Sequence, residues 1–165
     1  MRDFSISTTV RVYTIDELNE IDCQLVEKAK QMTERSYSPY SKFRVGAAAL
    51  LKDGSIVVGS NQENAAYPSG LCAERTALFA CGAQHPDQAV TTIAIAAWTD
   101  GHFVEDPVSP CGACRQVMLE TEHRYHHPIR VLLYGQKAVF EFESAESLLP
   151  FSFLAEDLKG LRRIH

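Results

Sequence analysis

The chain has 165 residues, of which 45% are hydrophobic and 22% charged, which is ordinary for a globular protein and excludes a disordered one. A formal net charge of -5 argues against a nucleic-acid-binding protein, because such proteins usually carry a basic surface. No apolar stretch has the length of a signal sequence or a membrane span, so we expect a cytoplasmic protein without a membrane partner. The length suits a single domain over residues 1–165, with residues 1–13 as an N-terminal extension.

The first predicted helix begins at a capping box. Thr14 would be its N-cap, and the Glu17 side chain would reach back to the Thr14 backbone. Apolar residues then recur at helical spacing as far as Arg35. These residues are Leu18, Ile21, Leu25, Val26, Ala29 and Met32.

A hairpin, a second helix and a buried strand follow. Lys52-Asp53-Gly54 is a turn signal between two predicted strands, residues 45–51 and 55–59. A helix is expected from Cys72 to about Gly82. Residues 91–98 are apolar and rich in β-formers, which is typical of a central strand.

The second half repeats the alternation of helix and strand. A helix is predicted from Cys111 to about Glu122, then strands over residues 129–134 and 138–143, then a short helix near Ser144. Alternating elements predict a three-layer α/β/α sandwich around a mixed sheet of about five strands.

Three cysteines form a pattern that is typical of a catalytic zinc site. Cys72 opens one predicted helix, and Cys111 and Cys114 open another, one turn apart. Three thiolate ligands leave the fourth tetrahedral position open for water, whereas a structural site would close with a fourth ligand. Glu74, close to Cys72, is then available as a proton shuttle.

A zinc site with three cysteine ligands carries an excess of negative charge. Three thiolates outweigh Zn²⁺ by one unit, although two helix N-termini would stabilise them. Arg75 could donate to the sulfurs, or it could make an ordinary surface ion pair, and spacing does not decide between these. A structural zinc site and a thioredoxin-like redox pair remain the alternatives from the residues alone. Cys23 and Cys81 are expected to be buried structural thiols.

The chain resembles the small homotetrameric cytidine deaminases from about Glu27 to Leu158. The resemblance rests first on Cys72-Ala73-Glu74-Arg75 and on Pro110-Cys111-Gly112-Ala113-Cys114. Further matching stretches are Tyr37–Phe43, Val45–Ala48, Asn61–Tyr67, Leu148–Pro150 and Glu156–Leu158.

This resemblance implies zinc-dependent hydrolytic deamination of cytidine, and of 2'-deoxycytidine, in pyrimidine salvage. Cys72, Cys111 and Cys114 would hold zinc, and Glu74 would be the catalytic acid and base. The implied assembly is a homotetramer in which each site is completed by a neighbouring subunit.

The resemblance also implies a set of substrate contacts. Asn61 and Glu63 would hold the ribose hydroxyls, Phe43 would lie against the pyrimidine, and the main chain near Ala65 and Ala73 would read the base edge. Without the resemblance, the ordinary interpretations are a loop-stabilising amide for Asn61, a solvated charge for Glu63 and a core residue for Phe43.

The chain departs from the family pattern at two places. Gln62 stands where the family usually has an apolar residue, and Phe151-Ser152 stands where it usually has a small pair. Phe153 matches the aromatic residue that closes over the base of a neighbouring subunit, but Phe151 leaves open which ring does so.

Three other functions remain as alternatives. One is a deaminase of another amino-heterocycle, such as a blasticidin-like antibiotic or a modified nucleoside, and a ribose-free substrate would have no use for the Asn61 and Glu63 pair. A polynucleotide editor is disfavoured by the acidic composition. A catalytically silent zinc protein would have no use for Glu74.

Overall fold

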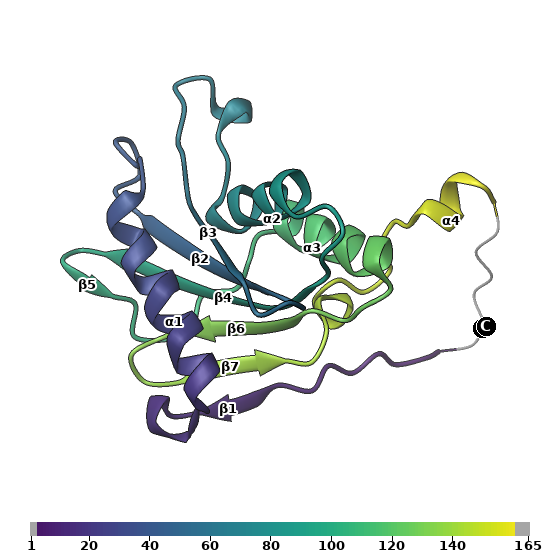
Figure 1. Cartoon of the computed structure of the whole chain (residues 1–165), viewed down its shortest axis with the longest axis horizontal. Helices are drawn as coiled ribbons and strands as arrows, with labels where there is room; N and C mark the ends of the chain where they lie inside the picture. Colours follow the sequence, from purple (N-terminus) through teal and green to yellow (C-terminus); the bar gives the residue numbers. More distant parts are fainter. Residues whose placement is uncertain (1–2, 161–165) are drawn as a thin grey trace.

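A mixed β-sheet lies between one long helix on one face and two helices on the other in the computed structural model, which describes residues 3–160. The strands are β1 (Arg11–Tyr13), β2 (Arg44–Leu51), β3 (Ile56–Ser60), β4 (Val90–Thr99), β5 (His102–Phe103), β6 (Arg130–Tyr134) and β7 (Val139–Phe142). The helices are α1 (Glu20–Met32), α2 (Ala73–Gln84), α3 (Gly112–Tyr125) and α4 (Ala155–Leu158). Helix α1 covers one face of the sheet and α2 and α3 cover the other, which confirms the predicted α/β/α sandwich (Figure 1).

Over residues 3–160 the sheet has seven strands, more than the expected number of about five. Its order is β1-β7-β6-β4-β2-β3, β5 pairs with β4, and only β4 and β6 run parallel. The five expected strands are present as β2, β3, β4, β6 and β7. Strand β1 comes from the predicted extension and covers the edge of β7, which would otherwise expose unpaired backbone groups. Strand β5 is the short return of the chain after the turn at Asp100 and Gly101.

The first α-helix begins later than predicted. The capping box does form, because the Thr14 amide donates to Glu17 Oε2 at 2.8 Å, but it begins only a 3-10 turn, Ile15–Glu17. The N-cap of α1 is Asn19, whose Oδ1 accepts from the Asp22 amide at 2.9 Å. Asn19 is an equally good N-cap, but it lies inside a longer helical pattern that local signals extend back to Thr14.

Two apolar clusters fill the space between the layers. One lies between the sheet and helices α2 and α3, and the other between the sheet and α1. Cys81 is 2% exposed in the first cluster, and burial raises the pKa of its thiol to about 11, so it stays uncharged as a structural thiol should. Cys23 is only partly buried, contrary to expectation, because it lies near the start of α1 with its Sγ 3.8 Å from the Ile15 and Leu18 carbonyl oxygens. No helix within residues 3–160 combines the length and the apolar character needed to cross a membrane.

Helix α2 approaches the sheet most closely at Gly59 of β3. A Cβ atom on Gly59 would lie 2.5 Å from the Ala77 nitrogen and 2.6 Å from the Ala73 oxygen, both in the α2 backbone. Because a backbone cannot rotate away as a side chain can, Gly59 determines how near to the sheet α2 can pack.

Replacing Gly59 with alanine is expected to lower the free energy of unfolding by about 1–3 kcal/mol, because the added methyl pushes α2 outward. The matched control is Gly82→Ala within α2, where an added Cβ meets only the mobile end of Arg124 at 3.3 Å. That change should raise stability by about 0.5–1 kcal/mol, since alanine is the better helix residue. Urea unfolding of both variants is the measurement, and equal stability of the two would contradict the close approach.

Candidate active site

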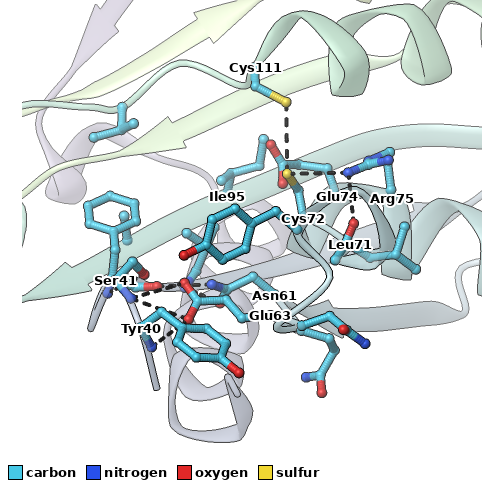
Figure 2. Close-up of a pocket in the computed structure, with 18 of the residues that line it drawn as sticks. Tyr40, Ser41, Asn61, Glu63, Leu71, Cys72, Glu74, Arg75, Ile95 and Cys111 are labelled. Carbon is cyan, nitrogen blue, oxygen red and sulfur yellow. Dashed lines mark hydrogen bonds between the residues drawn. The ribbon is translucent and has the colours of Figure 1, made fainter. Parts of the chain in front are cut away.

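A cavity of about 700 Å³ opens beside the N-terminal end of α2. Its lining residues come mainly from residues 40–45, 61–64, 70–75 and 108–111, so loops that are distant in the sequence meet at this point. Figure 2 shows Glu74, Cys72 and Cys111 on one side of the cavity and Asn61, Glu63 and Tyr40 on the other. The thiol and carboxyl groups of one wall therefore lie opposite hydrogen-bonding side chains on the other wall.

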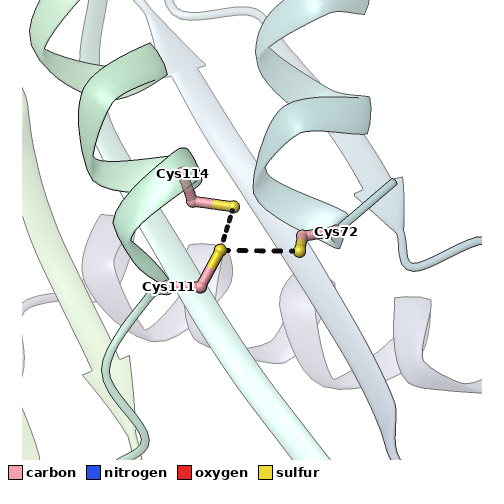
Figure 3. A group of neighbouring side chains, drawn as sticks. All are labelled: Cys72, Cys111 and Cys114. Atoms are coloured by element: carbon pink, nitrogen blue, oxygen red, sulfur yellow. Dashed lines mark hydrogen bonds between the residues drawn. The ribbon is translucent and has the colours of Figure 1, made fainter. Parts of the chain in front are cut away.

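The three predicted ligand cysteines lie together where two helices begin. Cys72 is the N-cap of α2 and Cys111 the N-cap of α3, with Cys114 in the first turn of α3. The sulfur atoms of Cys72 and Cys111 are 3.8 Å apart, and those of Cys111 and Cys114 are 3.5 Å apart (Figure 3). Two helix N-termini thus direct their positive ends at one group of thiols, as their sequence positions predicted.

The geometry of this group suits a zinc ion. Zinc binds cysteine sulfur at about 2.3 Å, so the sulfurs of a tetrahedral site lie about 3.8 Å from one another. The thiol of Cys114, the Arg75 guanidinium and the thiol of Cys111 lower the pKa of Cys72 to about 5. Hydrogen bonding with Cys72 and burial in turn raise the pKa of Cys114, so a nearby cation would be needed for both of these thiols to ionise together. A soft, all-sulfur donor set of this kind favours zinc over a hard cation.

Glu74 is the buried carboxyl group of the cavity. Its residue is 4% exposed, in the first turn of α2, and it lines the cavity beside Cys72 (Figure 2). Burial raises the pKa of its carboxyl group, and the negative charge of Cys72 raises it further. A carboxyl group whose pKa is shifted upward, toward neutral pH, is suited to accept and return a proton.

Arg75 lies against the ligand cysteines. Its Nη2 atom is 3.8 Å from the Cys72 sulfur and 3.4 Å from the Gly70 carbonyl oxygen. Within residues 3–160 its guanidinium takes part in no ion pair, so the surface ion pair is not what the structure has. Its role in balancing the third thiolate stays a prediction.

Asn61 is held in place by three hydrogen bonds. Its Oδ1 atom accepts from the Val45 amide at 2.8 Å and from the Ser36 hydroxyl at 2.5 Å, and its Nδ2 donates to the Phe43 carbonyl at 2.9 Å. The loop-stabilising role is therefore present. An amide nitrogen carries two hydrogens, so one N–H of Asn61 remains to be donated to a molecule in the cavity.

Glu63 lies beside Asn61 as an ionised acceptor. Its carboxylate accepts from the Tyr40 amide at 2.9 Å and from the Ser41 amide at 3.3 Å. The Ser41 hydroxyl is the main cause of a lowered pKa, so this carboxylate is charged at neutral pH. A carboxylate has about four acceptor positions, which leaves some of them free for hydroxyl groups in the cavity.

The remaining predicted contact residues divide between the cavity and the surface. Phe43 lines the cavity, and Ala73 is fully buried at the start of α2. Ala65 is exposed and does not line this cavity. Phe153 is 58% exposed and Phe151 is 70% exposed, and neither lines the cavity of its own chain.

Several cavity residues were not singled out from the sequence. Tyr40 and Tyr67 form an edge-on aromatic pair with ring centroids 6.3 Å apart, and both are largely exposed. Tyr40 belongs to the matching stretch Tyr37–Phe43, which is a usable signal. Ile95 and Tyr134 lie on β4 and β6 with no local sign that distinguishes them from core residues.

Residues 19–126 match the family described as the cytidine and deoxycytidylate deaminase zinc-binding region, a range that includes all three clustered cysteines. A cytidine deaminase of Halalkalibacterium halodurans is 43% identical over 134 residues, which are 81% of this chain and 95% of that relative. A cytidine deaminase of Mycobacterium tuberculosis is 39% identical over 138 residues, 82% of this chain and 91% of the relative.

Comparison with solved structures also finds cytidine deaminases. The crystal structure of cytidine deaminase from Burkholderia pseudomallei superimposes with a TM-score of 0.69 at 40% identity, over 82% of this chain and all of that chain. The enzyme structure from Mycobacterium tuberculosis has a TM-score of 0.64 at 31% identity, over 82% of this chain and 98% of that one.

Proposed function

Because this chain belongs to the cytidine deaminase family, we propose that it hydrolyses cytidine and 2'-deoxycytidine to uridine and deoxyuridine, with release of ammonia, in pyrimidine salvage. It is a zinc-dependent hydrolase that acts on the C–N bond of a cyclic amidine. The observation that carries this proposal is the buried carboxyl group of Glu74 beside three clustered thiols, in a cavity that also contains Asn61 and Glu63.

The chemistry divides between the metal and one carboxyl group. Cys72, Cys111 and Cys114 would hold zinc, which when bound would supply the Lewis acidity that brings the pKa of a water molecule toward neutrality. Glu74 accepts a proton from the attacking water molecule and delivers it to N3 of the pyrimidine while the water oxygen adds to C4. Glu74 then carries the second proton to the amino group, which leaves as ammonia, so water is consumed and the ring keeps the oxygen. Burial raises the pKa of the Glu74 carboxyl group, which favours uptake of a proton from water and so supports this shuttle.

The opposite wall of the cavity orients the nucleoside. The free N–H of Asn61 donates to one sugar hydroxyl, and the ionised Glu63 accepts from another. The Phe43 ring provides an apolar face for the pyrimidine. The base edge is read by main-chain groups near Ala73 and Ala65, whose chain neighbours Cys72 and Asn64 line the cavity. Because these groups are held by their own loops, they keep C4 near the metal at little entropic cost.

Replacing Glu63 with glutamine is expected to raise KM for cytidine roughly 10- to 100-fold, because a hydrogen bond to a charged group contributes about 1.5–3 kcal/mol. The same change should leave any turnover of free cytosine unaltered, since cytosine has no sugar hydroxyl. Absorbance assays with cytidine, deoxycytidine and cytosine measure both effects. Cytosine turnover equal to that of cytidine would contradict the nucleoside assignment and favour another amino-heterocycle.

We also propose a homotetramer in a reducing compartment, the cytoplasm. Exposed Tyr40, Tyr67 and Val108 at the rim of the cavity support coverage by a neighbouring subunit, and Phe153 lies outside its own cavity, where it can close another. Free thiols at all three ligand positions support a reducing compartment, because oxidation would remove the ligands. Sedimentation of the protein at the monomer mass of 18.4 kDa would contradict the tetramer.

A further inference from the structure

The N-terminal segment, residues 3–13, lies outside the matched family region and runs beside the last part of the described chain. Its final residues form β1, which pairs antiparallel with β7 from Arg11 opposite Glu141 to Tyr13 opposite Val139. In Figure 1 the segment continues beyond the end of β7, toward the side of the molecule where α4 lies. The N-terminal segment therefore lies alongside β7 and continues past its end.

Ion pairs of Arg11 hold the N-terminal segment against β7. Arg11 Nη1 is 2.8 Å from Glu141 Oε1, and the Glu141 side chain is only 8% exposed. Arg130 Nε lies 3.8 Å from the other oxygen of Glu141, and Arg11 also pairs with Glu143. Displacing Arg11 would leave the nearly buried Glu141 carboxylate with only the more distant charge of Arg130 to balance it. The N-terminal segment is therefore held in one register against β7.

Two further contacts reach the segment after β7, residues 144–153. The Thr8 hydroxyl donates to the Ser147 carbonyl at 2.9 Å. The rings of Phe4 and Phe151 lie 5.7 Å apart between centroids at an interplanar angle of 55°, within the range of favourable aromatic pairs. The N-terminal segment thus follows the chain as far as Phe151.

Phe151 needs such support. Its φ angle is +53°, in the left-handed region that bulky residues rarely adopt, and its residue is 70% exposed. On the side of α3, Arg115 Nη1 donates to the Leu148 carbonyl at 2.9 Å and Gln116 Nε2 donates to the Phe153 carbonyl at 2.8 Å. Residues 147–153 are therefore held between α3, which carries two ligand cysteines, and the N-terminal segment.

We propose that the N-terminal segment is a strap, and that Phe4 is a positioning residue that holds Phe151–Phe153 in the conformation needed to close a nucleoside cavity. This inference rests on the proposed function, in which Phe153 closes the site of a neighbouring subunit. Phe4 touches no substrate and acts only through the ring of Phe151.

The test compares Phe4→Ala with Val12→Ala in the full-length zinc enzyme. Both residues are apolar and mostly exposed, at 67% and 60%, but Val12 is held by β1 pairing and lies far along the segment from Phe4. Phe4→Ala should raise KM for cytidine roughly 2- to 10-fold with kcat nearly unchanged, which corresponds to the 0.5–1.5 kcal/mol of an aromatic pair. Phe4→Tyr should restore the wild-type KM, and Val12→Ala should not change it.

Hydrogen exchange gives a readout that does not depend on turnover. The amides of residues 151–154 should exchange faster in Phe4→Ala than in the wild type, while those of α2 should not change. Unchanged exchange, or faster exchange with an unchanged KM, would overturn the strap. A wild-type protein that does not deaminate cytidine would instead refute the proposed function, and exchange would still decide whether Phe4 orders this segment.

Discussion

Replacing Glu74 with glutamine is expected to lower kcat for cytidine roughly 10²- to 10⁴-fold, the contribution that a positioned acid and base makes to a reaction. Glutamine has nearly the same shape and can occupy the same 4% exposed position, but it cannot accept a proton from water or return one to the ring. Single-turnover absorbance assays with the zinc-loaded variant measure the loss directly.

The variant should retain its zinc and its affinity for the nucleoside. The matched control is Glu122→Gln, because Glu122 is also a buried glutamate, 7% exposed, but lies on α3 away from the cavity. Glu122 accepts from the amides of Ile129 at 2.6 Å and Ala145 at 2.8 Å, so its replacement should reduce stability and leave kcat per folded molecule unaltered. Near-normal ammonia release from Glu74→Gln would refute the assignment of the proton shuttle.

Replacing Cys114 with serine is expected to remove most of the bound zinc and, with it, all measurable turnover. Cys114 is fully buried at the first turn of α3, and a serine hydroxyl there is neither ionised nor a soft ligand. Removing one of three thiolates leaves only two protein ligands, too few for a catalytic zinc site. Metal analysis of the purified variant, compared with the wild type, measures the change.

The control for this change is Cys81→Ser, at a buried thiol outside the cluster. It should lower stability through a buried hydroxyl but keep the full zinc content. A chelator should inactivate the wild type, and added zinc should restore the wild type but not Cys114→Ser. Full zinc content in Cys114→Ser would show that the ion is bound elsewhere.

The positions of most helices and strands follow from local signals. The turn at Gly54, whose φ angle is +87°, joins β2 and β3 as predicted, and Cys72 and Cys111 stand at helix starts. The predicted start of α1 was wrong because two good N-caps, Thr14 and Asn19, lie within five residues of each other. Only packing decides which of them begins the α-helix.

The site was predictable wherever one short segment carries the chemistry. Glu74 follows Cys72 closely, so its place beside the clustered thiols is set by the geometry of a single helical turn. The hydrogen bonds of Asn61 were not predictable in this way, because they join residues from three separate segments of the chain. Tyr134 and Ile95 were missed for the same reason, since a strand residue gives no local sign that it faces a cavity.

By itself the sequence determined which groups are present and which elements carry them: three thiols and a carboxyl group at the starts of two helices, because caps and periodicity are local properties. Only the tertiary structure decided that these helix starts meet, since Cys72 and Cys111 are 39 residues apart and are brought to 3.8 Å by the order of the sheet. It also decided that the N-terminal segment pairs with β7 and reaches Phe151. Pairing between distant segments depends on which edge is left open and which charge is buried, and neither is encoded within one segment.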